Sequence, residues 1–373
     1  MPDYNIDFTG QGSLGSMVAN PGFHPGMLRP YTGRDGRSYI SRPTANGQWV
    51  SQLVSNAPST LLRLEWTELD QVVIRAALPR LRAVADLRGR GLQYTIPNGM
   101  SKTVLETQAQ SDINGASISM DGLADSIEDR PQYNLTNLPL PIIHKDFSFP
   151  ARQVAVTRQG GMPLDLAMAE LAARRVAEGA EQLLLGVAAG YAYGGGSIYG
   201  YTNFPQRLTY ALHSPLASSW TPRTFVNDVL AMRLASQQHF HYGPWVLYTS
   251  LAWDSYLDND LNALNANSSN ITLRDRVRRI EGIEDVVTLD YLNGYDVILV
   301  QMTTDVAREV VGMDITTVQW ETHGGMNLHF KVMCILIPQI RADANGNTGI
   351  VHGTVPGQTF QPSGAIYLPA GNP

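Results

Sequence analysis

Apolar side chains recur at a helical spacing in the segment 163–189. An apolar residue returns at every fourth position, which places a continuous stripe on one face of a helix. Pro163 suits the first helical position, and Gly186 lies near the expected end. Arg174 and Glu178 are expected to pair at i,i+4 spacing. At about 1.5 Å per residue such a helix is on the order of 40 Å long. We therefore expect a strut across the molecule, although an ordinary core helix of an α/β enzyme has the same pattern.

Two further segments have helical periodicity. One covers 67–87, with Thr67 as its expected N-cap and Pro79 at a position that should kink or divide it. The other covers 221–241, where Thr221 is the expected N-cap. In both segments a capping residue precedes the apolar period, and this combination predicts the start of a helix.

Short apolar runs separated by turn residues predict strands in much of the remaining chain. The segment 200–310 alternates such runs with helical patterns, which predicts one compact α/β unit. Two long strands are predicted at 316–323 and 327–343, joined as a hairpin. We also expect strands over 139–161, leading into the long helix, and a short edge strand at 350–355.

Two long stretches lack the apolar residues to form a core by themselves. Residues 1–60 are rich in Gly, Pro, Asn and Ser, yet they include aromatic residues such as Trp49 that a free linker does not need. Residues 92–138 are polar on both sides, with turn signals typical of a long hairpin. We expect both stretches to become ordered by lying on another surface, such as that of a neighbouring copy of the chain.

Composition narrows the classes of function. The chain has 373 residues, of which 43% are hydrophobic and only 16% charged, which suits a large core and extensive subunit contacts. A net charge of -6 argues against a chain whose main task is to grip nucleic acid. Cys334 is the single cysteine, so no internal disulfide can form, and its apolar neighbours predict an inert buried thiol. The apolar runs are too short to span a membrane, and the first residues do not predict a signal peptide.

No motif in the sequence predicts catalysis. The string GQGSLG at 10–15 fits a dinucleotide-binding pattern, but no strand is predicted before it and no helix after it. The sequence contains neither a P-loop nor a nucleophile elbow. His239 and His241 lack the third ligand that a metal site requires. We therefore predict no catalytic, cofactor or metal residues, and a protein that is not an enzyme.

One dense basic cluster lies in a short predicted helix. Acidic residues alternate with it, which is typical of a charged, solvated helix face. The same cluster could instead serve an interface where several subunits converge. Its members are Arg274, Arg276, Arg278 and Arg279.

The order of these parts resembles the major capsid protein of tailed bacteriophages of the Hong Kong 97 type, and the related encapsulin shell proteins. The likeness covers roughly 65–355 and rests on the order and spacing of successive segments. These are DFSFPARQVAVTRQGGMPLDLAMAELAARRVAEGAEQLLLG, GGGSIYGYTN, GPWVLYTSLAWDSYL, RVRRIEGIEDVVTLDYLNGYDVILVQ and VGMDITTVQWETHGGMNLHFKV.

The resemblance implies an α+β chain with the Hong Kong 97-type capsid fold. It further implies a division into an N-terminal arm, an N-terminal helix region, an extended loop, a peripheral domain with a long spine helix, an axial domain and a C-terminal tail. The expected bounds, in that order, are 1–60, 61–88, 89–150, 151–199 with 311–355 (spine helix 163–189), 200–310 and 356–373.

The resemblance also implies a function. It predicts a structural subunit that self-assembles, through pentamers and hexamers, into the icosahedral shell of a tailed bacteriophage, a virion assembled in the host cytoplasm. The implied partners are packaged double-stranded DNA, bound without sequence specificity, and separate scaffold, portal and decoration proteins, with no membrane. An encapsulin-like nanocompartment and an α/β enzyme with an unrecognised site are the alternatives. Some members form lysine–asparagine cross-links, and Lys102 in the predicted loop is the candidate lysine.

Overall fold

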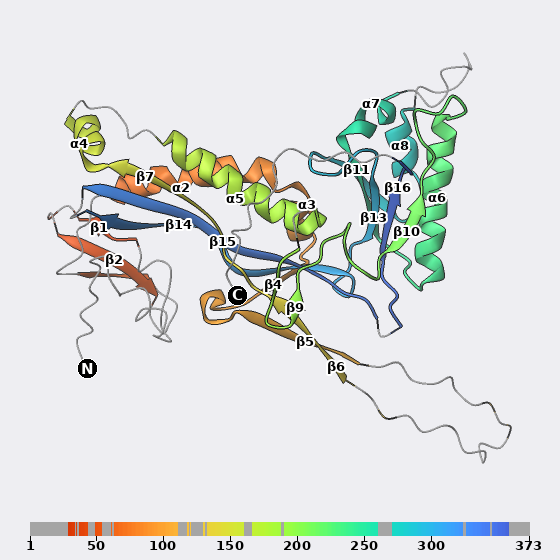
Figure 1. Ribbon diagram of the computed structural model, residues 1–373, viewed down its shortest axis with the longest axis horizontal. Helices are drawn as coiled ribbons and strands as arrows, with labels where there is room; N and C mark the ends of the chain where they lie inside the picture. Colours follow the sequence, from red (N-terminus) through yellow and green to blue (C-terminus); the bar gives the residue numbers. More distant parts are fainter. Residues whose placement is uncertain are drawn as a thin grey trace.

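Two separate sheets lie at opposite ends of an elongated molecule (Figure 1). One is a four-stranded sheet with helices along one face, and the other is a five-stranded sheet flanked by further helices. The computed structural model describes residues 29–33, 35, 37–43, 49–53, 61, 63–110, 118, 120, 130, 133–159, 166–187, 190–259, 271–323, 326–343 and 345–357.

The four-stranded sheet is built around a long antiparallel hairpin. Its two long strands pair from Ala307 opposite Ile340 to Thr322 opposite Asn327, which confirms the predicted hairpin. Cys334 is fully buried in this sheet, and its burial raises the pKa of the thiol, as expected for an inert core cysteine. The strands, in sheet order, are β4 (Gln93–Thr95), β14 (Ala307–Thr322), β15 (Asn327–Ile340) and β7 (Ile143–Pro150).

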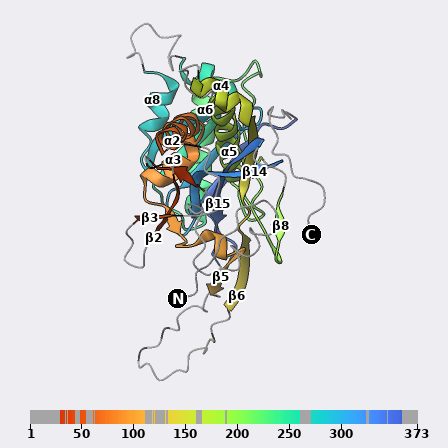
Figure 2. The ribbon, with the colours of Figure 1, turned by 90° about the vertical axis from the view of Figure 1, so that its left-hand side faces the viewer.

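Helices cover one face of this sheet, and α2 and α5 lie side by side over it (Figures 1 and 2). Phe147, Phe149 and Phe330 of the sheet pack together beneath them, with Trp66 of α2 edge-on to Phe330. The helical elements are α2 (Arg63–Ala77), η2 (Leu78–Arg80), α3 (Arg82–Gly89), α4 (Ala151–Gln159) and α5 (Ala167–Leu185).

The predicted long helix is present as α5, but it is shorter than predicted. It begins at Ala167, so Pro163 is not its first residue and lies outside the described residues. Gly186 ends the helix with φ at +79°, a conformation that glycine adopts without strain. The Gly/Tyr-rich loop that follows satisfies the last carbonyls, because the N–H of Tyr201 donates to Leu184 at 2.9 Å.

Two other helix predictions need correction. The helix predicted over 67–87 begins earlier, at Arg63, so Thr67 lies inside α2 and is not its N-cap. Pro79 does divide the segment, since it stands in a 3-10 turn between α2 and α3. Residues 151–159 form the helix α4 and not a strand, because β7 ends at Pro150.

The five-stranded sheet forms the second core. Its helix α6 (Pro222–Gln238) begins as predicted, with the Thr221 and Thr224 hydroxyls 3.0 Å apart at its N-terminus. Trp253 lies at the centre of this core, fully buried against Phe225. The strands, in sheet order, are β10 (Leu208–Ala211), β16 (Ile350–Thr354), β13 (Val297–Gln301), β11 (Trp245–Ser250) and β12 (Ile283–Leu289). The remaining helical elements of this part are η4 (Leu251–Trp253), α7 (Asp254–Leu257) and α8 (Leu273–Arg278).

The end of the chain differs from the expected division. Residues 311–355 were assigned together to the part with the long helix, but β16 lies in the five-stranded sheet, between β10 and β13. It is also not an edge strand, as 350–355 was predicted to be. The backbone N–H and C=O groups of β10 and β13 that face each other need hydrogen-bond partners. The strand β16, which comes much later in the chain, lies between them and pairs with both. The expected C-terminal tail, 356–373, lies outside the described residues except for 356–357.

A two-stranded hairpin projects from the other face of the four-stranded sheet (Figures 1 and 2). It consists of β5 (Val104–Gln110) and β6 (Tyr133–Pro139), and its base packs on Ile335 and Ile337. The loop predicted over 89–150 is therefore too wide at both ends, because β4 and β7 belong to the four-stranded sheet. The small elements β8 (Ala192–Tyr193), β9 (Gly196–Ser197) and η3 (Gly99–Ser101) lie near the hairpin's base.

The described part of the predicted N-terminal arm is folded against its own chain. It forms a three-stranded antiparallel sheet of β1 (Tyr31–Thr32), β2 (Ser38–Pro43) and β3 (Trp49–Leu53). Arg29 pairs with Asp70 of α2 at 2.7 Å. This part of the arm is therefore held without a neighbouring copy, which corrects the expectation for it, whereas residues 1–28 lie outside the described residues.

Candidate functional site

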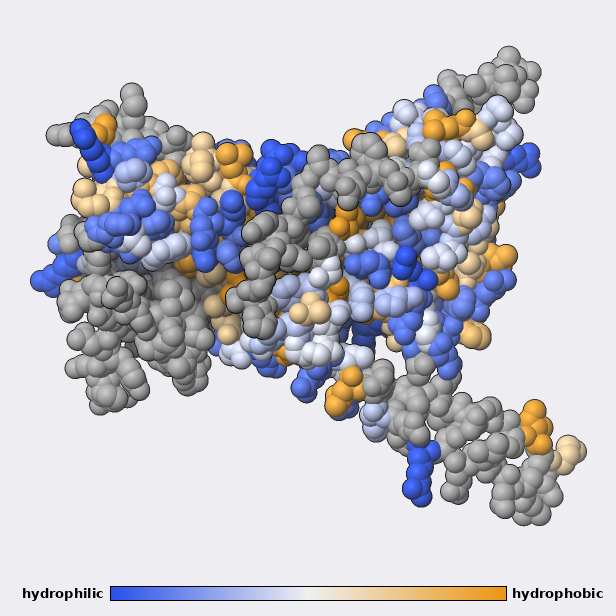
Figure 3. Space-filling model, in the orientation of Figure 1, coloured by the Kyte–Doolittle hydropathy of each residue, from blue (hydrophilic) through white to orange (hydrophobic). Residues whose placement is uncertain are grey.

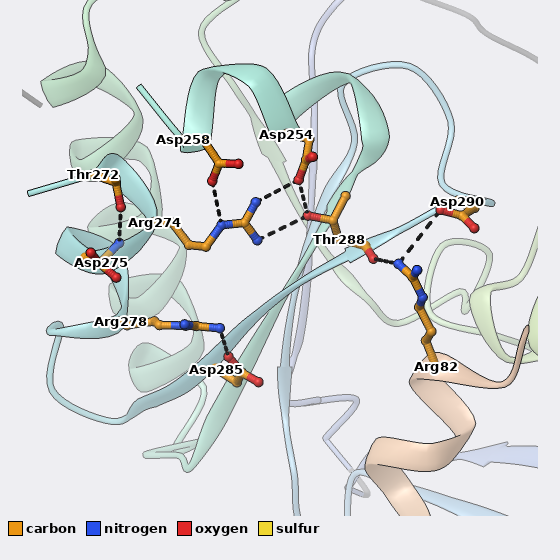
Figure 4. A network of polar contacts seen from close by, with 10 residues as sticks. All are labelled: Arg82, Asp254, Asp258, Thr272, Arg274, Asp275, Arg278, Asp285, Thr288 and Asp290. Carbon is orange, nitrogen blue, oxygen red and sulfur yellow. Dashed lines mark hydrogen bonds and ion pairs between the residues drawn. The ribbon is translucent and has the colours of Figure 1, made fainter. Parts of the chain in front are cut away.

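The predicted basic cluster lies on and just after α8, but its members do different things. Arg274 points into the subunit, where its guanidinium contacts Asp254 at 2.7 Å and Asp258 at 3.0 Å (Figure 4). Its third contact is the Thr288 hydroxyl at 3.3 Å. Hydrogen bonds from Arg274 and Thr288 hold the pKa of Asp254 below its usual value. Arg274 therefore ties α7, α8 and β12 together within one chain.

The other three arginines make fewer contacts than Arg274. Arg278 pairs with Asp285 at 2.6 Å (Figure 4), and both side chains are about half exposed. Arg276 is half-buried and Arg279 is exposed. Within the described residues, neither of these two guanidinium groups has an ion-pair partner. The structure thus separates the four predicted members: Arg274 holds three elements together, Arg278 pairs with Asp285, and Arg276 and Arg279 have no ion-pair partner among the described residues.

A second polar site, which the sequence analysis missed, surrounds the short helix α3. The side chain of Glu181 on α5 accepts hydrogen bonds from the backbone N–H groups of Ala83 at 2.7 Å and Val84 at 3.2 Å. Glu181 is 1% exposed. Burial raises the pKa of its carboxyl group to about 7, against the opposing effect of the two N–H donors.

Further contacts join α3 to both sheets. Arg88 forms an ion pair with Glu309 of β14 at 2.9 Å, and Glu309 is 2% exposed. The Tyr248 hydroxyl of β11 donates to Asp86 at 3.1 Å, and Arg90 pairs with Glu284 of β12. The long helix α5, the strand β14 and the five-stranded sheet therefore all contact α3 or its C-cap residue Arg90.

A third group of charges links the long helix to the five-stranded sheet. Arg174 and Arg175 contact Glu178 at 2.7 and 2.9 Å, the first being the predicted i,i+4 pair. Burial of Glu178 opposes ionisation, but the hydrogen bonds of Arg174 and Tyr291 outweigh it and hold the pKa below its usual value. Arg82 donates to the backbone carbonyl of Thr288 at 3.0 Å (Figure 4), beside Asp290.

One sequence signal could have located the α3 site. Glu181 stands among apolar positions of the long helix, between Ala180 and Leu184, where a solvent-exposed carboxylate is not expected. A charged residue on the apolar stripe indicates a buried partner. The identity of that partner could not be read from the sequence, because Ala83 is 98 positions away.

The described part of the projecting hairpin and its loop exposes large apolar side chains. Tyr133 and Leu135 of β6 are 61% and 59% exposed, and Ile118 and Met120 are fully exposed. Figure 3 shows hydrophobic residues at the far end of this projection. Lys102 is exposed beside η3, at the root of the hairpin and not along its length.

The charged side chains of one surface groove and the predicted histidine His239 are engaged in contacts within the described residues. A groove of about 580 Å³ lies between the N-terminal sheet, α2, η3 and β14. Its charged residues are already paired, Arg29 with Asp70 and Asp314 with Arg88. His239 is bonded to Asn347 at 2.7 Å, and no group of three His, Cys, Asp or Glu side chains among the described residues is placed to hold a metal. Within the same part of the chain, no helix has the length and apolar character needed to cross a membrane.

Comparison with known proteins agrees with this architecture. A virus-like particle from Pyrococcus furiosus superposes with a TM-score of 0.52 at 14% identity, covering 78% of this chain and 99% of that one. The capsid of a native GTA particle superposes with a TM-score of 0.51 at 12% identity. This alignment covers 74% of this chain and 91% of the other. No curated protein matches the sequence.

These likenesses confirm the expected Hong Kong 97-type capsid fold, with mixed helices and strands in several sheets. A family model also matches residues 56–353, which is most of the chain. The chain therefore belongs to the Family of unknown function (DUF6260) and has the fold of the Hong Kong 97-type shell proteins.

Proposed function

We propose that this chain is the repeating subunit of the icosahedral head of a tailed bacteriophage, which encloses double-stranded DNA. The fold supports the proposal, because the two structures compared above are described as a virus-like particle and a capsid. Such a subunit acts by assembly and not by catalysis. Each copy contributes contacts that are individually weak, and heterologous contacts that close into rings build the lattice.

The hairpin β5–β6 is the observation that carries the proposal. An isolated two-stranded hairpin is marginally stable in water. Only the base of this hairpin is packed, through Leu105 and Leu138, whereas Tyr133 and Leu135 are largely exposed. A neighbouring copy in a shell would bury these side chains at about 25 cal/mol per Å² of apolar surface. The hairpin is therefore built to lie over an adjacent subunit.

The charge distribution fits the same role. A net charge of -6 suits a wall that contains DNA without binding it tightly. Arg276 and Arg279 are the members of the basic cluster that remain available for contacts between subunits. Lys102, exposed at the root of the hairpin, is the lysine we would test for a covalent cross-link. Pentamers and hexamers, with scaffold, portal and decoration proteins in the host cytoplasm, complete the proposed assembly.

Electron microscopy of the expressed protein tests the proposal. Negative staining should show hexamers, pentamers or closed shells. Purified particles from infected cells should protect double-stranded DNA from nuclease. A monodisperse small dimer at all concentrations would contradict a shell function.

A cellular nanocompartment is the second candidate, and one observation favours it. The structure described as a virus-like particle comes from Pyrococcus furiosus, a cellular organism, and it aligns with this chain over 99% of its length. The two functions differ in cargo. Shells purified from the native source that contain a defined protein and no nuclease-protected DNA would establish the nanocompartment and exclude the phage head.

A further inference from the structure

The helix α3 occupies the junction between the two sheets. It follows α2 and η2, packs against α5 and β14, and its polar side chains reach β11 and β12. Two of the direct polar contacts that join the two ends of the molecule are made by Asp86 of α3 and by Arg90, the C-cap residue that follows this helix. The contacts of α3 therefore help to hold the five-stranded sheet against the long helix, together with the Glu178 group and the apolar core that both ends share.

The N-terminus of α3 has no local cap. Its N-cap residue is Leu81, whose side chain cannot accept a hydrogen bond. The free N–H groups of Ala83 and Val84 instead donate to the two carboxylate oxygens of Glu181. A buried side chain of α5 thus does what a Ser or Asp normally does from within the helix's own sequence. Without Glu181, two buried N–H groups would lose their partners.

We propose that Glu181 is a positioning residue: its side chain latches α3 onto the spine helix α5, and α3 in turn fixes the orientation of the five-stranded sheet. The latch connects the long helix to the five-stranded sheet through two successive contacts. Glu181 holds the start of α3, and from the middle of that helix Asp86 holds Tyr248 of β11. Loss of the latch frees α3 to move, and the five-stranded sheet moves with it. This inference concerns one chain and does not depend on shell formation.

The surroundings of Glu181 make the latch sensitive to protonation. Asp86 of α3 faces it and disfavours its charge, and the N–H of Arg82 also points towards it. Tyr201, from the loop after β9, and Tyr248 of β11 face it with neutral rings that stack 6.0 Å apart. Burial raises the pKa of the Tyr201 hydroxyl, and the negative charge of Glu309 on β14 raises it further. Within this described surrounding, the N–H groups of α3 are the main favourable partners of a charged Glu181, and protonation of either oxygen weakens the bond that this oxygen accepts.

The single buried cysteine makes a distance measurement practical. Gln71 on α2 and Asn227 on α6 are both exposed, and they stand on the two ends that the latch joins. Gln71→Cys and Asn227→Cys accept spin labels, whereas Cys334 is fully buried and does not. Double electron–electron resonance then reports the distance between the two ends. Amide hydrogen exchange at Ala83 and Val84 reports the latch itself.

Two variants of Glu181 are compared on this labelled background. Glu181→Ala should exchange the amides of Ala83 and Val84 at least about tenfold faster, and should broaden or shift the distance distribution. Glu181→Gln keeps one of the two acceptor oxygens and should shift the distribution less than Glu181→Ala does. Glu170→Gln, an exposed change on the same helix, is the matched control.

The outcomes separate the latch from a purely local cap. Faster amide exchange in Glu181→Ala with an unchanged distance distribution would overturn the proposal, because α3 would then not hold the sheet. If Glu181→Ala fails to fold, Tyr248→Phe gives the second test, since it removes the contact between α3 and β11 at the other end of the latch. An unchanged distribution in Tyr248→Phe would overturn the proposal as well. Both measurements are made on the unassembled chain, so microscopy that finds no shells leaves the latch standing.

Discussion

The guanidinium of Arg88 and the carboxylate of Glu309 lie 2.9 Å apart, joining α3 to β14 across a distance of 221 positions in the sequence. Glu309 is 2% exposed, and its burial raises the pKa of the carboxyl group despite the pairing. Arg88 therefore stabilises the fold mainly by compensating the charge of Glu309, which is buried whether or not Arg88 is present. Removing the partner of a buried charge costs more than the pair contributes on its own.

Arg88→Met should destabilise the chain by about 2–3 kcal/mol at pH 8, because it leaves Glu309 buried without its partner. The loss should decrease as the pH falls, since a protonated Glu309 needs no cation. The double variant Arg88→Met/Glu309→Gln should recover most of the stability. Chemical denaturation of the three proteins at pH 8 and pH 5.5 measures this, and a double variant no more stable than Arg88→Met would contradict it.

Elements with strong local signals could be predicted from the sequence. The start of α6 follows from Thr221 and Pro222, and the end of α5 follows from Gly186. The two long strands β14 and β15 follow from their apolar runs. In each case the residues that decide the structure are neighbours in sequence, so a local pattern is sufficient.

Features that depend on distant partners could not be predicted. Two of the buried carboxylates, Glu181 and Glu309, find their partners 98 and 221 positions away, and no local pattern indicates such distances. The basic cluster divided for the same reason, because Asp254 and Thr288 draw Arg274 inward while Arg279 stays exposed. The place of β16 inside the five-stranded sheet is also decided by pairing that only the fold reveals.

Trp66→Phe should loosen the N-terminal sheet. The indole N–H of Trp66 donates to the carbonyl of Pro30 at 2.9 Å, and Arg29 lies over its ring at 4.6 Å from the ring centroid. The variant keeps the apolar contact with Phe330, loses the hydrogen bond to Pro30 and weakens the contact with Arg29, at a cost of about 1–2 kcal/mol. The amide of Thr32, which donates to Leu61, should exchange faster.

A second tryptophan gives the control for that experiment. Trp320 stacks on His329, with ring centroids 5.2 Å apart, in the four-stranded sheet. Trp320→Phe should leave the exchange of the Thr32 amide unchanged. Equal acceleration in both variants would mean a general loss of stability and not a local release of the N-terminal sheet.

Arg274 and Arg279 should respond differently to removal of charge. Arg274→Gln breaks contacts with Asp254 and Asp258, and should lower the free energy of unfolding by about 1 kcal/mol, since the carboxylates are partly exposed. Arg279→Gln should change it by less than about 0.5 kcal/mol. If Arg279 serves contacts between subunits, its variant should instead raise the concentration at which particles appear. Denaturation and light scattering on the same samples distinguish the two effects, and identical behaviour of both variants would refute the division of the cluster.

Stability should depend on pH through Glu181. Its pKa is about 7 in the folded chain, above the ordinary value of 4.5, so the folded state binds the proton more tightly than the unfolded state. The resulting stabilisation is complete below pH 4.5 and is lost as the pH rises to 7, with a total on the order of 3 kcal/mol. Glu181→Gln has no titrating group at this position, so its free energy of unfolding should not show this part of the pH dependence. The difference in unfolding free energy between the two proteins, measured from pH 4.5 to pH 8, tests this, and parallel curves would show that Glu181 does not titrate in that window.

Replacing the exposed apolar residues of the hairpin should block assembly without unfolding the chain. Tyr133 and Leu135 are 61% and 59% exposed, so Tyr133→Ser/Leu135→Ser should change the free energy of unfolding by less than about 0.5 kcal/mol. If a neighbouring copy covers them, each substitution removes about 1–2 kcal/mol from that contact, and the concentration needed for assembly should rise by more than tenfold. Glu106→Gln, an exposed change on the paired strand β5, should assemble like the parent protein. Particles that form at the parent concentration from the double variant would mean that the hairpin is not a contact between subunits, and the proposed shell would then need another surface to hold its copies together.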